Sequence, residues 1–349
     1  MAAKANKRKR EKLTSASLEL EFREWLESGN GFANQDLIAE MIQTAIKLAG
    51  DDANRGDLKI LQRALKELRY AFKVFAPYRS VRKVSMFGST RIQEGDPYYR
   101  MAVRVASRLA DEGYMVITGA GSGIMQAGHE GAGRDRSFGV NIQLPFGQEA
   151  NRFIAQDPKL ITFHFFFTRK LIFVKEADAA VFFPGGYGTH DEAIEALTLA
   201  QTGKSQIIPI ILADLPGRGY WRDWKDFVHR EMLRNGFILE QDLNFFQIVE
   251  DDEAVARAIK RFYRNYHSYR FVKQDLLIRL LRPPTAALVE RLNRDFRDIL
   301  TGGEVRETGP LPEELEDSET LSLQRLLVPF NRKDSGRLRQ LIDVINEEE

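Results

Sequence analysis

The stretch PGGYGTHDE, residues 184–192, places adjacent glycines directly before a threonine and a carboxylate. Adjacent glycines let a backbone approach a ligand closely, and a helix that begins near Thr189 would point unpaired N–H groups at an anion. Phosphate is the anion that such a loop most naturally binds. Because no P-loop lysine accompanies the loop, it suits a single phosphate better than a triphosphate.

Glu192 allows two interpretations. The spacing Thr189-x-x-Glu192 is that of a capping box, in which both side chains satisfy backbone groups of the first helical turn. Thr189 could also cap the helix alone, which leaves Glu192 free to face a cleft and act in acid–base chemistry. Asp191 and Glu195 would then raise its pKa, because neighbouring like charges oppose ionisation. We favour the cleft.

A second glycine-rich stretch, TGAGSGIMQAG at 118–128, follows an apolar run. Ile124 stands where a dinucleotide fingerprint has its third glycine, and no Gly-Lys-Ser/Thr follows. Alone, the stretch fits a tight turn and a mononucleotide cradle about equally, and the neighbouring loops favour the cradle.

Arg169 and Lys170 begin a predicted helix, where basic residues oppose the helix dipole and so suggest an anionic partner. Arg169 has the fork geometry that suits phosphate or carboxylate.

Other chemistries lack support. The five histidines show no metal-ligand spacing, so no metal is assigned, and no nucleophile elbow surrounds a serine. The absence of cysteine excludes disulfides, thiolate nucleophiles and zinc–thiolate sites, and is consistent with a reducing compartment.

The bulk properties point to a cytoplasmic globular protein. An apolar content of 43% supports a sizeable core, and no apolar run approaches the ~20 residues that span a bilayer. The net charge of +1 gives no reason to expect nucleic acid or membrane as a partner. We interpret the basic residues 1–12 as a disordered, solvated tail.

The hydrophobic patterns predict an α/β protein. Residues 13–80 read as a helical extension that serves packing or oligomerisation, with Asp36 and Asp57 as N-caps. Residues 81–268 alternate strands and helices, which predicts a Rossmann-like, doubly wound parallel sheet. The carboxyl ends of its strands bring the glycine-rich loops to one edge. Residues 269–349 read as a helical extension with a linker at 301–319.

The same stretches together resemble the LOG (Lonely Guy) family. The resemblance covers roughly residues 80–265 and rests on GSTR (88–91), TGAGSGIMQAGHEGA (118–132), NIQLPFGQEANRF (141–153), TRK (168–170) and PGGYGTHDE. It implies a hydrolase that splits the N-glycosidic bond of a nucleoside 5′-monophosphate into free base and ribose 5-phosphate. It also implies a cofactor-independent reaction and a homodimer or higher homo-oligomer with the site near the subunit interface.

Carried over to this chain, the resemblance makes Arg169 and Glu192 the catalytic pair. The positions that it implies around the substrate are Gly88, Ser89, Gly119, Gly121, Met125, Lys170, Gly185, Gly186, Gly188 and Thr189.

The chain departs from the family pattern at Ala120, where a glycine is usual, and we expect its methyl group to alter the fit of base or ribose. Gln126 replaces a common glutamate. Ala120 and the extensions motivate an alternative function, a nucleotide-binding regulatory or scaffold protein with a degenerate site. Nucleotide binding without hydrolysis would identify that alternative.

Overall fold

The computed structural model describes residues 24, 34–145, 149–315 and 317–347, so the basic tail at 1–12 lies outside the described residues. The chain divides into two compact units, residues 1–66 and 67–349. No helix in the described part is long and apolar enough to cross a membrane.

Among the described residues, two α-helices precede the first strand, as the periodicity predicts: α2 (Gln35–Lys47) and α3 (Arg55–Phe75). The predicted caps are wrong by two or three residues. Asp36 lies inside the first turn after Asn34, and the Asn54 side chain accepts hydrogen bonds from the N–H groups of Gly56 and Asp57 at 2.7 and 3.1 Å. Asn54 therefore supplies the cap that the sequence reading gave to Asp57.

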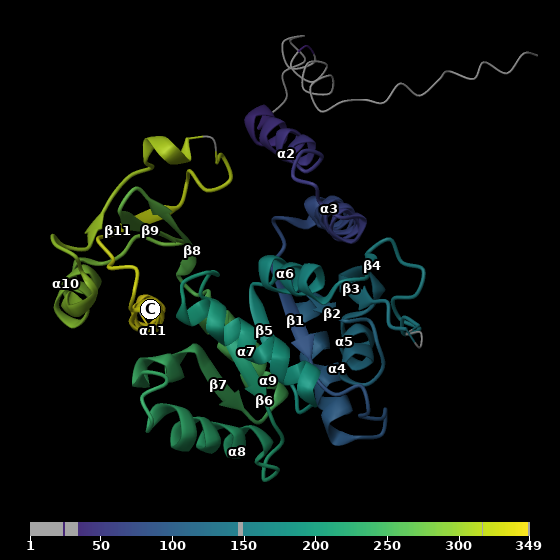
Figure 1. The fold of residues 1–349 in the computed structure, drawn as a ribbon. Helices are drawn as coiled ribbons and strands as arrows, with labels where there is room; N and C mark the ends of the chain where they lie inside the picture. The colour runs from purple at the N-terminus through teal and green to yellow at the C-terminus, as the bar shows by residue number, and fades with distance from the viewer. Residues whose placement is uncertain (1–23, 25–33, 146–148, 316, 348–349) are drawn as a thin grey trace, which may run out of the picture. The chain divides into compact units, whose positions relative to one another are not determined.

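The predicted parallel sheet is confirmed, with seven strands in the order β4-β3-β2-β1-β5-β6-β7 (Figure 1). The strands are β1 (Lys83–Phe87), β2 (Met115–Thr118), β3 (Ser137–Ile142), β4 (Leu160–Phe163), β5 (Ala179–Phe182), β6 (Ile210–Ala213) and β7 (Phe246–Val249). The chain builds outward from β1 to β4 and then returns to the other side of β1 with β5. A topological switch point therefore lies between β1 and β5, where open α/β sheets bind ligands.

Helices cover both faces of this sheet. Val84 and Met86 of β1 pack in one apolar cluster with α4 (Pro97–Asp111), α5 (Ile124–Ala132) and α9 (Asp252–Phe262). Because side chains alternate along a strand, Phe87 faces the opposite side. That side is covered by the end of α3 and by α6 (Phe166–Glu176), α7 (Tyr187–Gln201) and α8 (Tyr220–Phe227).

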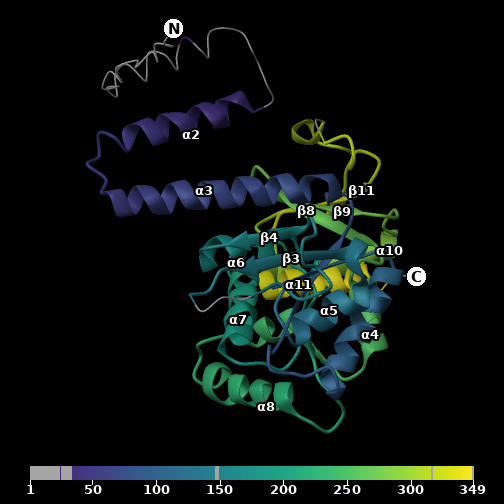
Figure 2. The same cartoon turned by 90° about the vertical axis from the view of Figure 1, so that its right-hand side faces the viewer.

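The C-terminal part is not the helical extension that was expected. It contains an antiparallel sheet in the order β10-β11-β9-β8, together with two helices (Figure 2). The elements are β8 (Tyr266–Val272), β9 (Asp275–Leu280), α10 (Ala286–Asp295), β10 (Arg306–Glu307), β11 (Gln324–Val328) and α11 (Ser335–Ile345).

The predicted linker at 301–319 is part of this packed unit. Glu314 is fully buried and lies 2.7 Å from Arg279 Nη2 and 2.9 Å from Arg325 Nε. A buried carboxylate is retained when cations compensate its charge, and here two arginines of the small sheet hold the segment in place.

Candidate functional site

Three loops meet at the switch point, and Ser89 joins them. The backbone N–H of Ser89 donates to Pro184 O at 3.1 Å, and its carbonyl accepts from the N–H of Ile124 at 3.1 Å. Gly123 has φ +68°, and a Cβ there would lie 2.2 Å from Ser89 O. These contacts hold together the loops that follow the carboxyl-terminal ends of β1, β2 and β5, as the strand order predicts.

The 184–189 loop is held by side chains from its own helix and from α8. Tyr220 donates its hydroxyl to Gly185 O at 2.5 Å. A Cβ at Gly185 would lie 2.1 Å from Thr189 Oγ1, so only glycine allows this close approach.

The capping interpretation of this loop is wrong. Helix α7 begins at Tyr187 after Gly186, and no side chain caps it. Thr189 is therefore the third helical residue, and Glu192 lies in the second turn.

A cleft of about 880 Å³ opens at this edge of the sheet. Ten of the twelve predicted site residues line it: Gly88, Ser89, Gly119, Met125, Arg169, Gly185, Gly186, Gly188, Thr189 and Glu192. Gly121 and Lys170 do not.

Arg169 and Glu192 face each other across the cleft wall from α6 and α7. Arg169 Nη2 lies 3.6 Å from Glu192 Oε1, and the side chains are 13% and 8% exposed. Burial raises the pKa of Glu192 to about 7, although Arg169 and Lys170 pull it down. Near neutral pH this carboxyl group can therefore exist in both protonation states, as acid–base catalysis requires.

The guanidinium of Arg169 is positioned by aromatic rings. Its Cζ lies 5.0 Å from the Phe166 ring centroid and 5.7 Å from that of Phe173, within range of cation–π attraction. Its Nε is buried and has no hydrogen-bond partner among the described residues. Buried donors are normally satisfied, so this N–H is available to a ligand.

Lys170 has a different placement from the one predicted. Its Nζ lies 3.0 Å from Asp191 Oδ1 and 2.9 Å from Glu195 Oε2. Burial alone would lower the pKa of Lys170, but its bonds to these two carboxylates outweigh burial and raise it. Lys170 joins α6 to α7 and thereby fixes the elements that carry Arg169 and Glu192.

The expectation that the Ala120 methyl alters the ligand fit is also wrong. Ala120 is fully buried and does not line the cleft. A Cβ added at Gly139 of β3 would lie 3.1 Å from the Ala120 Cβ, so the methyl group faces the sheet.

Several cleft residues were missed by the sequence reading. Five of them are apolar and form one part of the wall: Phe87, Ile142, Leu144, Phe166 and Phe173. The other four have polar groups and lie near the loops: Thr90, Arg91, Tyr187 and His190. Thr90 and Arg91 belong to the stretch GSTR (88–91) that follows β1, from which only Gly88 and Ser89 were predicted as site residues. The aromatic and aliphatic residues gave no signal beyond core-type hydrophobicity.

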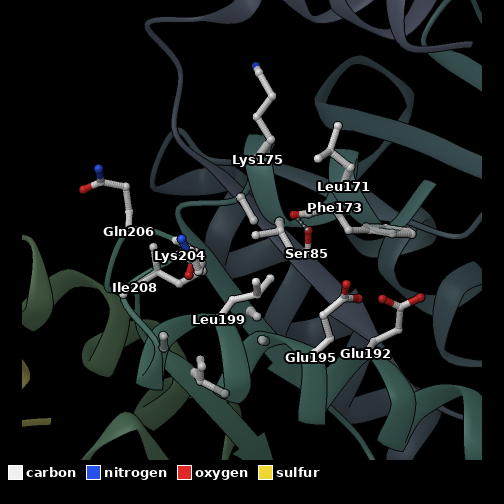
Figure 3. Close-up of a pocket in the computed structure, with 18 of the residues that line it drawn as sticks. Ser85, Leu171, Phe173, Lys175, Glu192, Glu195, Leu199, Lys204, Gln206 and Ile208 are labelled. Carbon is white, nitrogen blue, oxygen red and sulfur yellow. Dashed lines mark hydrogen bonds between the residues drawn. The ribbon is translucent and has the colours of Figure 1, made fainter. Parts of the chain in front are cut away.

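A second pocket of about 580 Å³ lies between α6 and α7, and Figure 3 shows its lining. Leu171, Leu199 and Ile208 contribute apolar surface, and Glu192 and Glu195 border one side. Phe87, Phe173 and Glu192 line both this pocket and the cleft. Among the described residues, no group of three or more histidine or acidic side chains could hold a metal ion.

Comparison with known proteins gives a family model, a relative and solved structures that match part of the chain. A family model described as "Possible lysine decarboxylase" matches residues 120–259. An uncharacterized protein of Archaeoglobus fulgidus is 32% identical over 114 residues, which are 33% of this chain and 74% of the relative.

Two solved structures are also similar. The molybdenum cofactor carrier protein of Chlamydomonas reinhardtii is 17% identical, with a TM-score of 0.38 over 52% of this chain and 97% of its own. The molybdenum cofactor binding protein of Rippkaea orientalis is 21% identical, with a TM-score of 0.35 over 52% and 94%.

Proposed function

This chain belongs to the LOG family, and we propose that it hydrolyses the N-glycosidic bond of a nucleoside 5′-monophosphate to free base and ribose 5-phosphate. The observation that carries the proposal is the Arg169–Glu192 pair, 3.6 Å apart, in the same cleft as a phosphate-type glycine loop.

The start of α7 is suited to the 5′-phosphate. The backbone N–H groups of Gly186, Tyr187 and Gly188 have no acceptor among the described residues. Unpaired N–H groups and the positive end of a helix dipole favour an anion at this point. Binding energy from the phosphate, which is remote from the reacting bond, then positions the sugar for reaction.

The reaction breaks the bond between C1′ and the base nitrogen; the electron pair leaves with the base, which takes up a proton from solvent. A water molecule adds to the oxocarbenium-like C1′ and loses a proton. Ionised Glu192 stabilises the developing positive charge and accepts that proton. Arg169 orients Glu192 or the phosphate and assists departure of the base. General acid–base assistance of this kind contributes ~10²–10⁴-fold to the rate.

The test compares AMP, GMP, CMP and UMP with the corresponding nucleosides and measures released base by chromatography. We expect hydrolysis of at least one nucleotide and little hydrolysis of its nucleoside, because the nucleoside forfeits the phosphate contacts. Equal turnover of both would contradict the role of the 184–189 loop.

The matched variants are Glu192→Gln and Glu176→Gln. Glu176 is 9% exposed and pairs with Lys175 on α6, but it does not line the cleft. The first change should reduce kcat by ~10²–10⁴, and the second should leave kcat unchanged. Equal activity of Glu192→Gln and wild type would refute the assigned mechanism.

The alternative of a binding protein with a degenerate site loses one of its two motives, because the Ala120 methyl faces the sheet. Calorimetric binding of AMP with no base release from any of the four nucleotides would restore it. The cleft residues do not support lysine decarboxylation, the activity in the description of the family model. A pyridoxal-phosphate enzyme needs a lysine at its site, and none of the residues that line the cleft is a lysine.

We further propose a homodimer through the α6–α7 face. Phe166, Phe167 and Leu171 of α6 are 52%, 55% and 48% exposed, and Ile194 of α7 is 39% exposed. A contiguous exposed apolar patch is typical of an interaction surface, and the family resemblance implies a second copy near the site. Leu171→Asp should therefore convert a dimer to a monomer in light scattering. A wild-type monomer would contradict the proposal.

A further inference from the structure

The backbone of the 118–123 loop adopts an unfavourable conformation at Ala120. Its φ is +61°, in the left-handed region that residues with a Cβ rarely occupy. Such a conformation persists only when its surroundings enforce it, and it is common at functional sites. The contacts of Ala120 should therefore identify what enforces it.

The Ala120 N–H donates to Thr118 Oγ1 at 3.1 Å, and Asn151 holds the Ala120 carbonyl group. The backbone N–H of Asn151 donates to Ala120 O at 2.8 Å, and its side-chain Nδ2 donates to the same oxygen at 3.0 Å. Nδ2 also donates to Gly121 O at 3.0 Å. Asn151 is 8% exposed, so these bonds form away from water. Two successive carbonyl groups of the loop are thus fixed by one residue.

His129 sets the orientation of the Asn151 amide. Its Nε2 lies 3.0 Å from Phe138 O, which can only accept, so the hydrogen-bond network assigns the proton to Nε2. Nδ1 is then an acceptor, which favours the nitrogen of the Asn151 amide on its side: Nδ2 lies 3.1 Å and Oδ1 3.3 Å from it, while the two Nδ2 hydrogens are directed at Ala120 O and Gly121 O. Burial lowers the pKa of His129 to about 4, so the imidazole stays neutral at physiological pH.

The clamped carbonyl groups lie next to a residue of the cleft. Gly119 lines the cleft, and a Cβ at Gly119 would lie 2.5 Å from Met125 Sδ and 3.9 Å from Arg169 Nη1. A change of conformation at Ala120 would displace the backbone of its neighbour Gly119, which lies close to both side chains. The cleft wall beside Arg169 therefore depends on a conformation that alanine itself disfavours.

We propose that Asn151 is a positioning residue, which holds Ala120 in its left-handed conformation and so sets the Gly119 wall of the cleft for the nucleotide. The proposal rests on the proposed function for its kinetic effect, but its structural effect can be measured without activity. It predicts that the effect of replacing Asn151 depends on the residue at position 120, because glycine adopts the same φ without strain.

The test uses Asn151→Ala, Ala120→Gly and the double variant. Asn151→Ala should raise KM for the nucleotide about tenfold, because two side-chain hydrogen bonds of typical strength are lost, with a smaller effect on kcat. Ala120→Gly should leave KM unchanged. The double variant should recover most of the lost affinity, since glycine at 120 no longer needs the clamp.

A matched control separates positioning from general destabilisation. Asn346 is 1% exposed and makes four side-chain hydrogen bonds, to Asn265, Tyr266, Phe262 and Ile342, outside the cleft. Asn346→Ala should lower the melting temperature and leave KM unchanged. The proposal is overturned if this control raises KM as much as Asn151→Ala does, or if the double variant binds as poorly as Asn151→Ala.

The rate of amide hydrogen exchange in the peptide that covers residues 118–123 tests, independently of turnover, whether Asn151 holds this loop. Asn151→Ala should accelerate exchange there, and adding Ala120→Gly should slow it again. Unchanged exchange in Asn151→Ala would refute the clamp even in an active enzyme. Accelerated exchange in a protein that hydrolyses no nucleotide would confirm the clamp while the proposed function fails.

Discussion

At the scale of single residues, burial determines how Glu192 can act. Its pKa is raised to about 7, so the ionised form that accepts a proton from water increases as pH rises through this value. We expect kcat/KM of the wild type to rise about tenfold per pH unit below 7 and to level off above it. A profile of kcat/KM that is flat between pH 5.5 and 7 would contradict this role.

The same raised pKa has a consequence for stability. Folding favours neutral Glu192, so the stability it contributes is complete below pH 4.5 and is lost as pH rises through about 7. Denaturant unfolding of wild type and Glu192→Gln across this range should therefore show that the wild type alone loses stability through this group. A parallel dependence of both proteins would contradict the assignment.

The family resemblance predicted the pair Arg169 and Glu192, but the motif spacing did not predict the register of their helices. The Thr189-x-x-Glu192 spacing fits a helix that starts after Thr189, yet glycine at 186 lets α7 start at Tyr187 without a side-chain cap. Lys170 follows Arg169, and neighbours on a helix point in different directions. Lys170 consequently meets the acidic side chains of α7 while Arg169 meets Glu192.

At the scale of elements, α8 supports the phosphate-type loop through Tyr220. Replacing it by Phe removes the bond to Gly185 O, which is worth ~0.5–1.5 kcal/mol, so we expect KM to rise about two- to tenfold. Tyr263→Phe is the control, because its hydroxyl donates to Asp178 O at 2.6 Å and Tyr263 does not line the cleft. Equal KM values for the two variants would contradict the support.

Strands that are almost entirely buried were predictable, and the two edge strands of the parallel sheet were not. β4 and β7 have four residues each, with exposed or half-exposed positions between buried ones. Such segments give little periodic signal, and their place at the two edges of the sheet is set by pairing with β3 and β6.

At the scale of the whole molecule, one buried carboxylate fixes the segment at 301–319 to the C-terminal sheet. Glu314→Ala leaves Arg279 and Arg325 without their common partner, which should cost ~3–5 kcal/mol in the free energy of unfolding. Glu313→Ala breaks a pair with exposed Lys273 and should leave the free energy of unfolding nearly unchanged, because water screens an exposed ion pair. Equal losses in denaturant unfolding would contradict the account of Glu314.

The architecture of the C-terminal part could not be predicted because its pairings are distant in the sequence. Leu326 of β11 pairs with Ile278 of β9, across the intervening helix α10 and the acidic segment. Gly302, Gly303 and the prolines of that segment suggest a linker locally, but the burial of Val305 and Glu314 and the pairing of β10 with β11 show that the segment is packed. The parallel sheet was predictable because its strands and helices alternate locally.

The central claim is that the cleft breaks a glycosidic bond, and chromatography of AMP incubated with the full-length protein tests it most directly. The account predicts adenine and ribose 5-phosphate in equal amounts, formed at least ~10²-fold more slowly by Glu192→Gln. Intact AMP, or adenosine with free phosphate, would contradict it, since the latter products come from cleavage at the phosphate ester.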